Sequence, residues 1–265
     1  SPYRGLAGVG VAYVLAQALA ESLGNPADLG NSLLELFTLG TIADLAPLTG
    51  VNRRWVQEGL RHLPTSRMAG VQALVQVTGL GGEKNLKPEA IGFRLGPRIN
   101  AVGRLADPVI VIELLTTDDP AVAYERALQC EQINLQRQNL CAEIEQEAIA
   151  LCEAGALDVV GDRVLVLVQQ GWHHGVIGIV ASRLVERYGV PVFIGTYEDE
   201  AGTVIRGSAR SIPEFHVFDA LEYCKDVLEK HGGHQAAGGF SLKAENLAAL
   251  RSRLREFAHQ SLELE

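Results

Sequence analysis

The octapeptide 232–239, Gly-Gly-His-Gln-Ala-Ala-Gly-Gly, places one imidazole among four glycines and two alanines, so its backbone and His234 are expected to be uncovered. Glycine permits positive φ and close backbone approach, and N–H groups that point the same way form a concave anion site. The ligand that best suits such a site is a phosphate. The same composition also suits a tight turn between a helix and a strand, with one surface histidine. The octapeptide alone leaves both interpretations open.

Arginine and serine alternate in the segment 203–211, Thr-Val-Ile-Arg-Gly-Ser-Ala-Arg-Ser. If this segment is a strand, Arg206, Ser208 and Arg210 point to one face, with successive members roughly 6–7 Å apart. That distance is near the separation of successive phosphates in an extended single strand. An edge strand with exposed arginines would have the same sequence, so both interpretations remain.

Three more arginines, Arg94, Arg98 and Arg104, lie in the segment 93–104, Phe-Arg-Leu-Gly-Pro-Arg-Ile-Asn-Ala-Val-Gly-Arg. The glycine and proline predict turns between them. A guanidinium group matches two phosphate oxygens at once, which a lysine cannot do. A solvated face would mix lysine and glutamate with the arginines, and this segment contains neither. A phosphate contact is therefore favoured over structural pairing.

The segment 171–183, Gly-Trp-His-His-Gly-Val-Ile-Gly-Ile-Val-Ala-Ser-Arg, follows a predicted strand and opens a predicted helix. Adjacent histidines rarely converge on one metal ion without a carboxylate nearby, and none is close in sequence. The favoured interpretation is a helix N-terminus that faces a ligand, with free N–H groups and a favourable dipole. Gly175 and Gly178 would permit close packing or close approach, and the role of His174 is left open.

Asp44 is a lone carboxylate in the otherwise apolar window 40–48, Gly-Thr-Ile-Ala-Asp-Leu-Ala-Pro-Leu. A carboxylate in such surroundings is costly unless it caps a helix, pairs with a cation or binds a metal. From these residues alone, a cap or a salt bridge is favoured over a metal.

The elements that position these segments follow from apolar spacing. Residues 6 to about 118 are predicted to be mostly helical, with helices over 6–23, 33–45, 55–63 and 68–77. One long helix is predicted from 118 or 119 to about 154, opened by Asp119 as its cap and Pro120 in its first turn. Within this helix three cysteines recur every eleven residues and are expected to be buried rather than to bind zinc: Cys130, Cys141 and Cys152.

After Gly155 the pattern changes to strands that alternate with helices. Strands are predicted over 163–168, 190–196 and 202–210, and helices over 176–188, 217–230 and 244–260. Such alternation predicts a small α/β domain. The chain is thus divided into a helical block at 1–118, a connecting helix at 119–155 and an α/β domain at 156–265.

Composition and charge limit the class of protein. The 265 residues are 47% hydrophobic, which indicates well-filled cores of one large or two ordinary domains. No apolar run reaches the roughly 18–20 residues of a membrane helix, and no signal peptide is evident, so a cytoplasmic protein without a membrane partner is expected. The net charge of −9 argues against a broad nucleic-acid-binding face, but a local arginine cluster would suffice to grip one strand end.

The five segments, in this order along the chain, resemble the RecJ exonucleases, a family of DHH phosphoesterases. The resemblance runs from Leu6 to about Leu242 and is carried by Leu-Gly-Thr-Ile-Ala-Asp-Leu-Ala-Pro-Leu, Gly-Pro-Arg-Ile-Asn-Ala-Val-Gly-Arg, Trp-His-x-Gly-Val-Ile-Gly-Ile-Val-Ala-Ser-Arg, Gly-Ser-x-Arg-Ser and Gly-Gly-His. It implies an α/β fold made of the helical C-terminal part of a DHH catalytic domain, a connecting helix and a small DHH-associated domain. It also implies 5′→3′ hydrolysis of single-stranded DNA in recombination and repair.

The resemblance assigns roles to individual residues. Asp44 would be the last carboxylate of a two-metal Mn²⁺ or Mg²⁺ cluster, which reverses the preference drawn above from the residues alone. The partner would be single-stranded DNA with a 5′ end, and the parent enzyme would work with a single-strand-binding protein or a helicase. The residues expected to bind the substrate are Arg98, Asn100, Arg104, His173, Arg206, Ser208, Arg210, Gly232, Gly233 and His234.

Departures from the family pattern limit what this chain is expected to do. It has no Asp-x-Asp motif and no Asp-His-His triplet, and the oligonucleotide-binding domain of the family is missing. One carboxylate cannot hold two cations, so the chain by itself is expected to be inactive. Two alternatives are a non-catalytic single-strand-binding module and a relative that hydrolyses short oligonucleotides or cyclic dinucleotides. Enzymes of the latter kind usually lack the Gly-Pro-Arg-Ile-Asn motif and the long helix.

Overall fold

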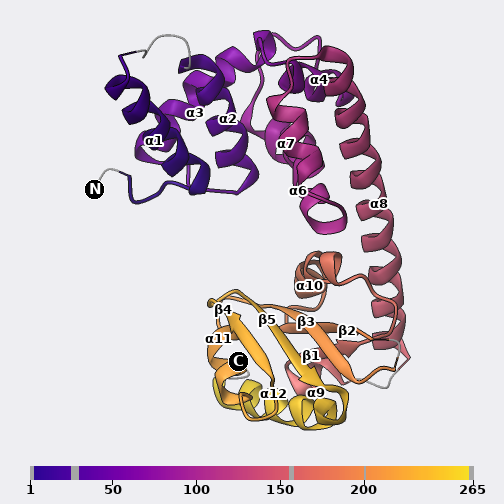
Figure 1. Cartoon of the computed structure of the whole chain (residues 1–265). Helices are drawn as coiled ribbons and strands as arrows, with labels where there is room; N and C mark the ends of the chain where they lie inside the picture. The colour runs from indigo at the N-terminus through magenta and orange to yellow at the C-terminus, as the bar shows by residue number, and fades with distance from the viewer. Residues whose placement is uncertain (1–2, 25–29, 155–157, 200, 263–265) are drawn as a thin grey trace. The chain divides into compact units, whose positions relative to one another are not determined.

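The chain forms two compact units, Ser1–Gln136 and Arg137–Glu265, which we call the helical unit and the sheet unit (Figure 1). The computed structural model describes residues 3–24, 30–154, 158–199 and 201–262. Among these residues, no helix is both long enough and apolar enough to cross a membrane. The boundary between the units lies inside helix α8 (Pro120–Glu153), so the helix expected to be a spacer contributes one half to each unit.

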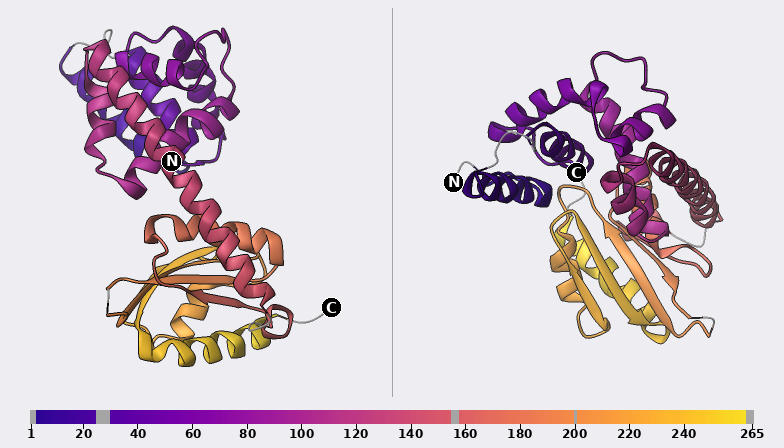
Figure 2. Two further views of the ribbon diagram at one scale, coloured as in Figure 1. Left: turned by 90° about the vertical axis from the view of Figure 1, so that its right-hand side faces the viewer. Right: turned by 45° about the horizontal axis from the view of Figure 1, so that its top comes forward.

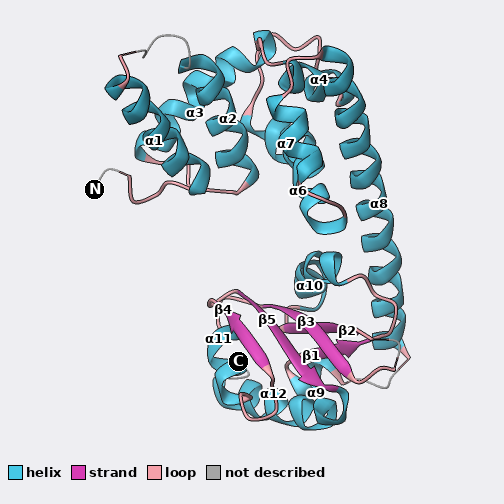
Figure 3. Cartoon of the chain, viewed as in Figure 1, coloured by secondary structure: helices cyan, strands magenta, loops and turns pink. Residues whose placement is uncertain are grey.

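The helical unit consists of helices joined by loops, as the apolar spacing predicts (Figure 3). Within its described residues it contains no strand. Its elements before α8 are α1 (Gly8–Ser22), α2 (Gly30–Ala43), α3 (Gly50–His62), the 3₁₀ turn Leu63–Thr65, α4 (Ala69–Val77), α5 (Pro88–Ala90), the π-helical turn Ile91–Leu95, α6 (Gly96–Leu105) and α7 (Val109–Thr116).

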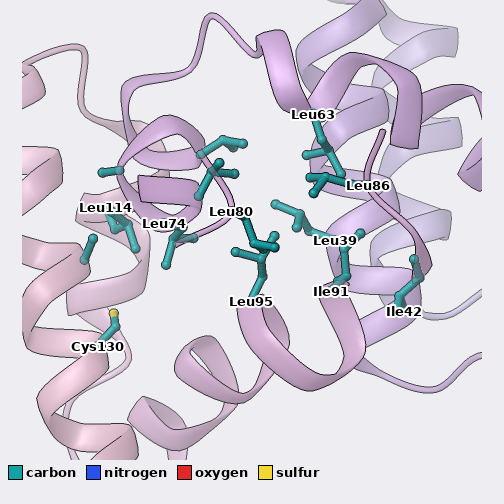
Figure 4. Close-up of a cluster of buried hydrophobic side chains, with 14 of the residues drawn as sticks. Leu39, Ile42, Leu63, Leu74, Leu80, Leu86, Ile91, Leu95, Leu114 and Cys130 are labelled. Carbon is teal, nitrogen blue, oxygen red and sulfur yellow. The ribbon is translucent and has the colours of Figure 1, made fainter. Parts of the chain in front are cut away.

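The core of the helical unit joins leucines and isoleucines from helices far apart in the sequence (Figure 4). An aromatic group closes one side, where Tyr13, Phe37 and Trp55 lie with ring centroids 5.2–5.4 Å apart. Leu74, from α4, and Leu95, from the π-helical turn, are almost fully buried. This packing fixes the place of α6, which follows directly on the π-helical turn.

Helix α8 begins as its sequence predicts, because the Asp119 carboxylate accepts a hydrogen bond of 2.8 Å from the Ala121 N–H and Pro120 is the first helical residue. Cys130, Cys141 and Cys152 are all buried and unoxidised, in agreement with the predicted buried stripe. Cys130 belongs to the core of the helical unit.

The sheet unit is a five-stranded mixed sheet with the order β1-β2-β3-β5-β4. Strand β1 is parallel to β2, with α10 as the connection, and all other pairs are antiparallel. The elements are α9 (Val159–Asp162), β1 (Leu165–Val168), α10 (His174–Tyr188), β2 (Val192–Tyr197), β3 (Val204–Arg210), α11 (Val217–Tyr223), β4 (Lys230–Gly233), β5 (Ala237–Lys243), the 3₁₀ turn Ala244–Asn246 and α12 (Leu247–Ser261).

The two faces of this sheet are covered differently, with α10 on one face and α11 and α12 on the other (Figure 2). Ile205 and Ala209 of β3 point toward α11 and α12 and are fully buried in the core there. The alternate residues of β3, Arg206, Ser208 and Arg210, therefore lie on the α10 face. We call this side of β3, β5 and β4 the polar face.

Two predictions for the sheet unit were wrong. The helix expected over 217–230 ends at Tyr223, and Lys230 is already the first residue of β4. The octapeptide is not a turn between a helix and a strand, since it forms the end of β4, a tight turn and the start of β5. Glycine has a low intrinsic preference for strands, so the glycine-rich sequence gave no sign of a hairpin. In the structure, β4 pairs with β5 and β5 pairs with β3.

Candidate nucleic-acid interface

Asp44 lies immediately after α2 and is exposed, so it bears no cost of burial. The next residue, Leu45, has a φ of 55° and a side chain that is 85% exposed. A bulky residue in this conformation costs free energy and marks a site where function can outweigh stability. A carboxylate at the C-terminal end of a helix also opposes the helix dipole. The local geometry therefore presents Asp44 outward without giving it a capping role.

Asn100 of α6 joins two of the sequence motifs, because its side-chain amide donates a 3.1 Å hydrogen bond to the carbonyl of Ala43, next to Asp44. A Cβ at Gly96 would lie 3.2 Å from the Cβ of Ala43, so α6 packs closely on the end of α2. Arg104 is exposed in the last turn of α6. The two sequence segments 40–48 and 93–104 are therefore in contact at the end of α2.

Arg98, also on α6, has a protein partner. Its Nε and Nη2 donate to the two carboxylate oxygens of Glu131 on α8, at 2.5 and 3.1 Å, and its Nη1 donates to the Arg94 carbonyl at 2.8 Å. Both charged side chains are largely buried, with 16% and 24% of their surface exposed. This is the structural pairing that the absence of acidic residues from the segment argued against. A phosphate would have to compete with Glu131 for the guanidinium group.

The predicted turns in the segment 93–104 are also absent. Gly96 and Pro97 are the first residues of α6, where a proline fits without losing a hydrogen bond. Arg94 donates to the carbonyl of Thr78 and lies 3.8 Å from Glu83. The arginines of this segment thus serve the packing of α6 and its neighbours, and Arg104 is the most outward of them.

The described residues do not form a metal site by themselves. No group of three or more histidine, cysteine, aspartate or glutamate side chains within them is arranged to hold a metal ion. Asp44 provides a single carboxylate, whereas Mg²⁺ and Mn²⁺ are bound through oxygens from several groups.

The polar face of the sheet unit is built around β3, which lies between β2 and β5 and is not the edge strand that its sequence also allowed. A Cβ at Gly178 of α10 would lie 3.0 Å from Nη2 of Arg210 and 3.4 Å from Oγ of Ser208. Glycine at this position therefore lets α10 approach the strand closely, as predicted. Arg210 is half-buried beneath α10, and Arg206 is exposed.

His173 caps α10, because its Nδ1 accepts a 3.0 Å hydrogen bond from the Gly175 N–H. Burial, together with the neighbouring His174, lowers the pKa of His173. The two imidazole rings are stacked, with centroids 5.0 Å apart. His173 therefore shapes the start of the helix, and His174 is the more exposed of the two.

The octapeptide forms a hairpin in which each glycine has its own surroundings. Gly233 has a φ of 156°, and a Cβ there would lie 2.4 Å from the Ala237 carbonyl oxygen, so only glycine fits. The His234 N–H donates to that same carbonyl at 2.8 Å, which makes a tight turn. His234 itself is exposed at the tip. The turn interpretation is thus correct for the backbone, although the turn joins two strands.

An open cavity of about 490 Å³ lies on the polar face. It gathers two of the predicted residues, Arg206 and Ser208. The other predicted residues of the sheet unit, His173, Arg210, Gly232, Gly233 and His234, do not line it. The lining also includes polar residues that the sequence did not single out as substrate-binding, namely His174, Glu198, Lys230, His231 and Ser241.

The register of the sheet explains why these residues were missed. Lys230 and Ser241 reach the cavity because they pair across β4 and β5, and Ser241 pairs with Arg206. The alternation of β5 was the available signal, since Phe240 and Leu242 are buried and Ser241 between them is not. Lys230 could not be placed while it was assigned to a helix.

Comparisons with known proteins match part of the sheet unit and nearly the whole chain. Residues 161–260 match the DHHA1 domain family. The single-stranded-DNA-specific exonuclease RecJ of Bacillus subtilis is 41% identical over 261 residues, which cover 98% of this chain and 32% of that protein. RecJ of Thermus thermophilus is 35% identical over 251 residues, covering 95% of this chain and 35% of that protein. The chain thus spans about a third of the length of these relatives.

Solved structures match in fold as well as in sequence. RecJ of Thermus thermophilus in complex with Mn²⁺ superposes with a TM-score of 0.84 at 33% identity, covering 96% of this chain and 36% of that one. The Mg²⁺ complex of the same protein gives a TM-score of 0.83. Relatives with this fold therefore bind divalent cations. With a matching domain, similarity along nearly the whole sequence and the same fold, the chain belongs to the RecJ family.

Proposed function

We propose that this chain is part of a metal-dependent exonuclease that degrades single-stranded DNA in the 5′→3′ direction, and that its sheet unit binds the phosphate backbone of the strand. The observation that carries the proposal is the cavity on the polar face, which lies within the match to the DHHA1 domain. Arg206, Lys230 and two serine hydroxyls face one carboxylate, Glu198, so cationic groups and hydrogen-bond donors predominate. Such a lining suits phosphate oxygens.

Within the sheet unit, Arg206 and Ser208 would contact the strand directly. Arg210 lies under α10 next to Ser208, where its charge would reinforce the same contact. His173 would act through the start of α10, which it caps. Gly232, Gly233 and His234 would contact the strand from the β4–β5 hairpin, where His234 is exposed.

Within the helical unit, Asp44 would supply one oxygen ligand to Mn²⁺ or Mg²⁺. Two such ions, when bound side by side, would activate water and stabilise the charge that develops during hydrolysis of a phosphodiester. The described residues contain no group of three or more possible metal ligands, so the chain alone is expected to bind a strand without cutting it. Asn100, bonded to the residue before Asp44, and Arg104, exposed in the last turn of the same helix, would hold the strand, as would Arg98 if phosphate displaced Glu131.

The whole protein would act in the cytoplasm on single-stranded DNA with a 5′ end. We assign it a single-strand-binding protein or a helicase as a partner, since such a nuclease needs exposed single strands. A wide basic surface would be needed to wrap a duplex, and the chain carries a net charge of −9. A local grip on one strand is compatible with that charge.

The proposal is tested by binding of a fluorescent, 5′-phosphorylated oligothymidylate to the chain without metal, followed by anisotropy. We expect Arg206→Ala to lower the affinity about three- to tenfold, as expected for the loss of one charged phosphate contact. Arg255→Ala is the matched control, because both arginines are about half exposed and each lies in a surface ion pair, with Glu198 at 3.4 Å and Asp162 at 3.7 Å. Arg255 is on α12, on the opposite side of the sheet.

Equal losses for the two variants would show that only general charge matters and would contradict a site on the polar face. Binding of a cyclic dinucleotide in preference to the linear strand would favour the phosphoesterase alternative. When Mn²⁺ is added to the same samples, the purified chain should leave the strand intact. Degradation that copurifies with the chain through several columns would contradict the assignment of most metal ligands elsewhere.

A further inference from the structure

Lys230 belongs to a row of three polar side chains that crosses three strands. It pairs with Ser241 of β5, which pairs in turn with Arg206 of β3. Directly paired residues of neighbouring strands point to the same face, so all three side chains lie on the polar face. Arg206 and Lys230 are two strand spacings apart, which is about 10 Å between their backbones. All three residues line the cavity.

A second row runs beside the first and is nearly bare. Ser208 pairs with Gly239, which pairs with Gly232. A Cβ at Gly232 would meet nothing within 4 Å, and one at Gly239 would meet only the Gly207 carbonyl oxygen at 3.8 Å. Packing within the sheet unit therefore does not require glycine at either position. The two glycines leave a strip of exposed backbone about 7 Å from the first row.

The two cations at the ends of the first row differ in their ion pairing. The Arg206 guanidinium lies 3.4 Å from Glu198. The Lys230 ammonium has no hydrogen-bond or ion-pair partner within the described parts of the chain. Ser241 stands between them with a hydroxyl donor. An anion over Ser241 would thus be attracted from both sides and would lie away from the Glu198 carboxylate.

Strand β4 holds Lys230 in place through contacts on the other face. His231 is the next residue, so its side chain points away from the cavity cations, and its Nε2 lies 2.7 Å from a carboxylate oxygen of Glu222 on α11. This hydrogen bond lowers the pKa of Glu222. The backbone of β4 is also paired with β5 along its whole length. The position of the Lys230 backbone is therefore fixed without any ligand.

We propose that Arg206, Ser241 and Lys230 form a phosphate subsite of their own, next to the Ser208 and Arg210 contact, so that the sheet unit binds two successive phosphates of one strand. The bare strip over Gly239 and Gly232 receives the sugar that links them. This inference rests on the proposed function and specifies the smallest substrate that occupies both subsites. A strand with two phosphates fills the face, and a mononucleotide leaves the Lys230 subsite empty.

The test compares two probes on the full chain in the presence of a metal chelator, by isothermal titration calorimetry at low salt. One probe is thymidine 5′-monophosphate, and the other is the 5′-phosphorylated thymidine dinucleotide, which has a second phosphate. We expect Lys230→Gln to weaken binding of the dinucleotide about fivefold and to leave binding of the mononucleotide unchanged. The dependence of dinucleotide affinity on salt should also become less steep, by about one released counterion.

Two further variants separate the subsite from general charge and from folding. Lys225→Gln removes the same charge from an exposed lysine that follows α11 and lies 3.7 Å from Glu222, and it should change neither affinity. Lys230→Arg keeps the charge and should restore most of the dinucleotide affinity. A Lys230→Gln variant that unfolds at a lower temperature than the Lys225→Gln variant would contradict a role limited to ligand binding.

The outcomes distinguish the inference from the function on which it rests. If the unaltered chain binds neither probe, both the proposed function and the subsite are wrong. If the chain binds both probes, and Lys230→Gln weakens neither or weakens both equally, the subsite is wrong and the proposed function stands. A selective loss for the dinucleotide, absent from the Lys225→Gln variant, is the result that supports the subsite.

Discussion

The arginines of the helical unit and those of the sheet unit come from segments that look alike in sequence, yet they have different surroundings. Arg98 is clamped by Glu131, which comes from a helix 33 residues further along the chain. Arg206 is exposed over a cavity with hydroxyl groups beside it. A run of arginines without acidic neighbours in sequence therefore indicates a phosphate site only if no distant carboxylate reaches it.

The two arginines should differ most in what they contribute to stability. Arg98→Ala would remove the two hydrogen bonds of a largely buried ion pair and a third to the Arg94 carbonyl, which leaves the Glu131 carboxylate without its partner. We expect the free energy of unfolding to fall by about 2–4 kcal/mol. Arg206→Ala breaks a surface pair and should cost less than about 1 kcal/mol. Denaturant titration of both variants makes the comparison, and similar losses would refute the contrast between the two arginines.

A smaller difference in stability is expected between substitutions on the two faces of the sheet. Gly238 and Gly239 are neighbours on β5, but a Cβ at Gly238 would lie 2.8 Å from side-chain atoms of both Leu221 and Val217 on α11. We expect Gly238→Ala to destabilise the protein by about 1–3 kcal/mol through overpacking. Gly239→Ala should leave the melting temperature nearly unchanged and should weaken binding of the strand. The prediction fails if thermal unfolding ranks the two variants the other way.

The smallest effect concerns the two stacked histidines. Because the pKa of His173 is lower in the folded protein than in the unfolded chain, protonation favours unfolding, so stability should decline as the pH falls below about 6.5. His173→Asn keeps a capping acceptor and removes the titration, which should make this decline shallower. A titration of the His173 ring by NMR checks the premise, and a midpoint at or above the ordinary histidine value would exclude it.

Much of the fold could be predicted from local signals. The start of α8 follows from Asp119 and Pro120, and the strand β1 follows from its unbroken apolar run. The β4–β5 hairpin could not be predicted in the same way, because its glycines carry no strand preference and its pairing with β3 is a long-range interaction. Register was therefore the missing information, and the position of Lys230 depends on it.

The candidate site shows the same limit. Arg206, Ser208 and Arg210 were placed on one face by the two-residue period of a strand, and the structure has them there. The approach of α10 at Gly178 was also foreseeable from its glycine. The pairing of Arg98 with Glu131 could not be predicted, because neither segment contains a pattern that indicates contact with the other. Partners across large sequence separations escape any argument from composition and spacing.

Strand β4 is the last strand on its side of the sheet, so its outer N–H and C=O groups form an open edge. Open edges can recruit strands of other molecules and lead to aggregation. This edge is only four residues long, begins with a lysine and ends in two glycines. A short edge that begins with a charged residue is a poor template for another chain. The residues proposed to hold a strand of DNA would thus also keep the sheets of separate molecules apart.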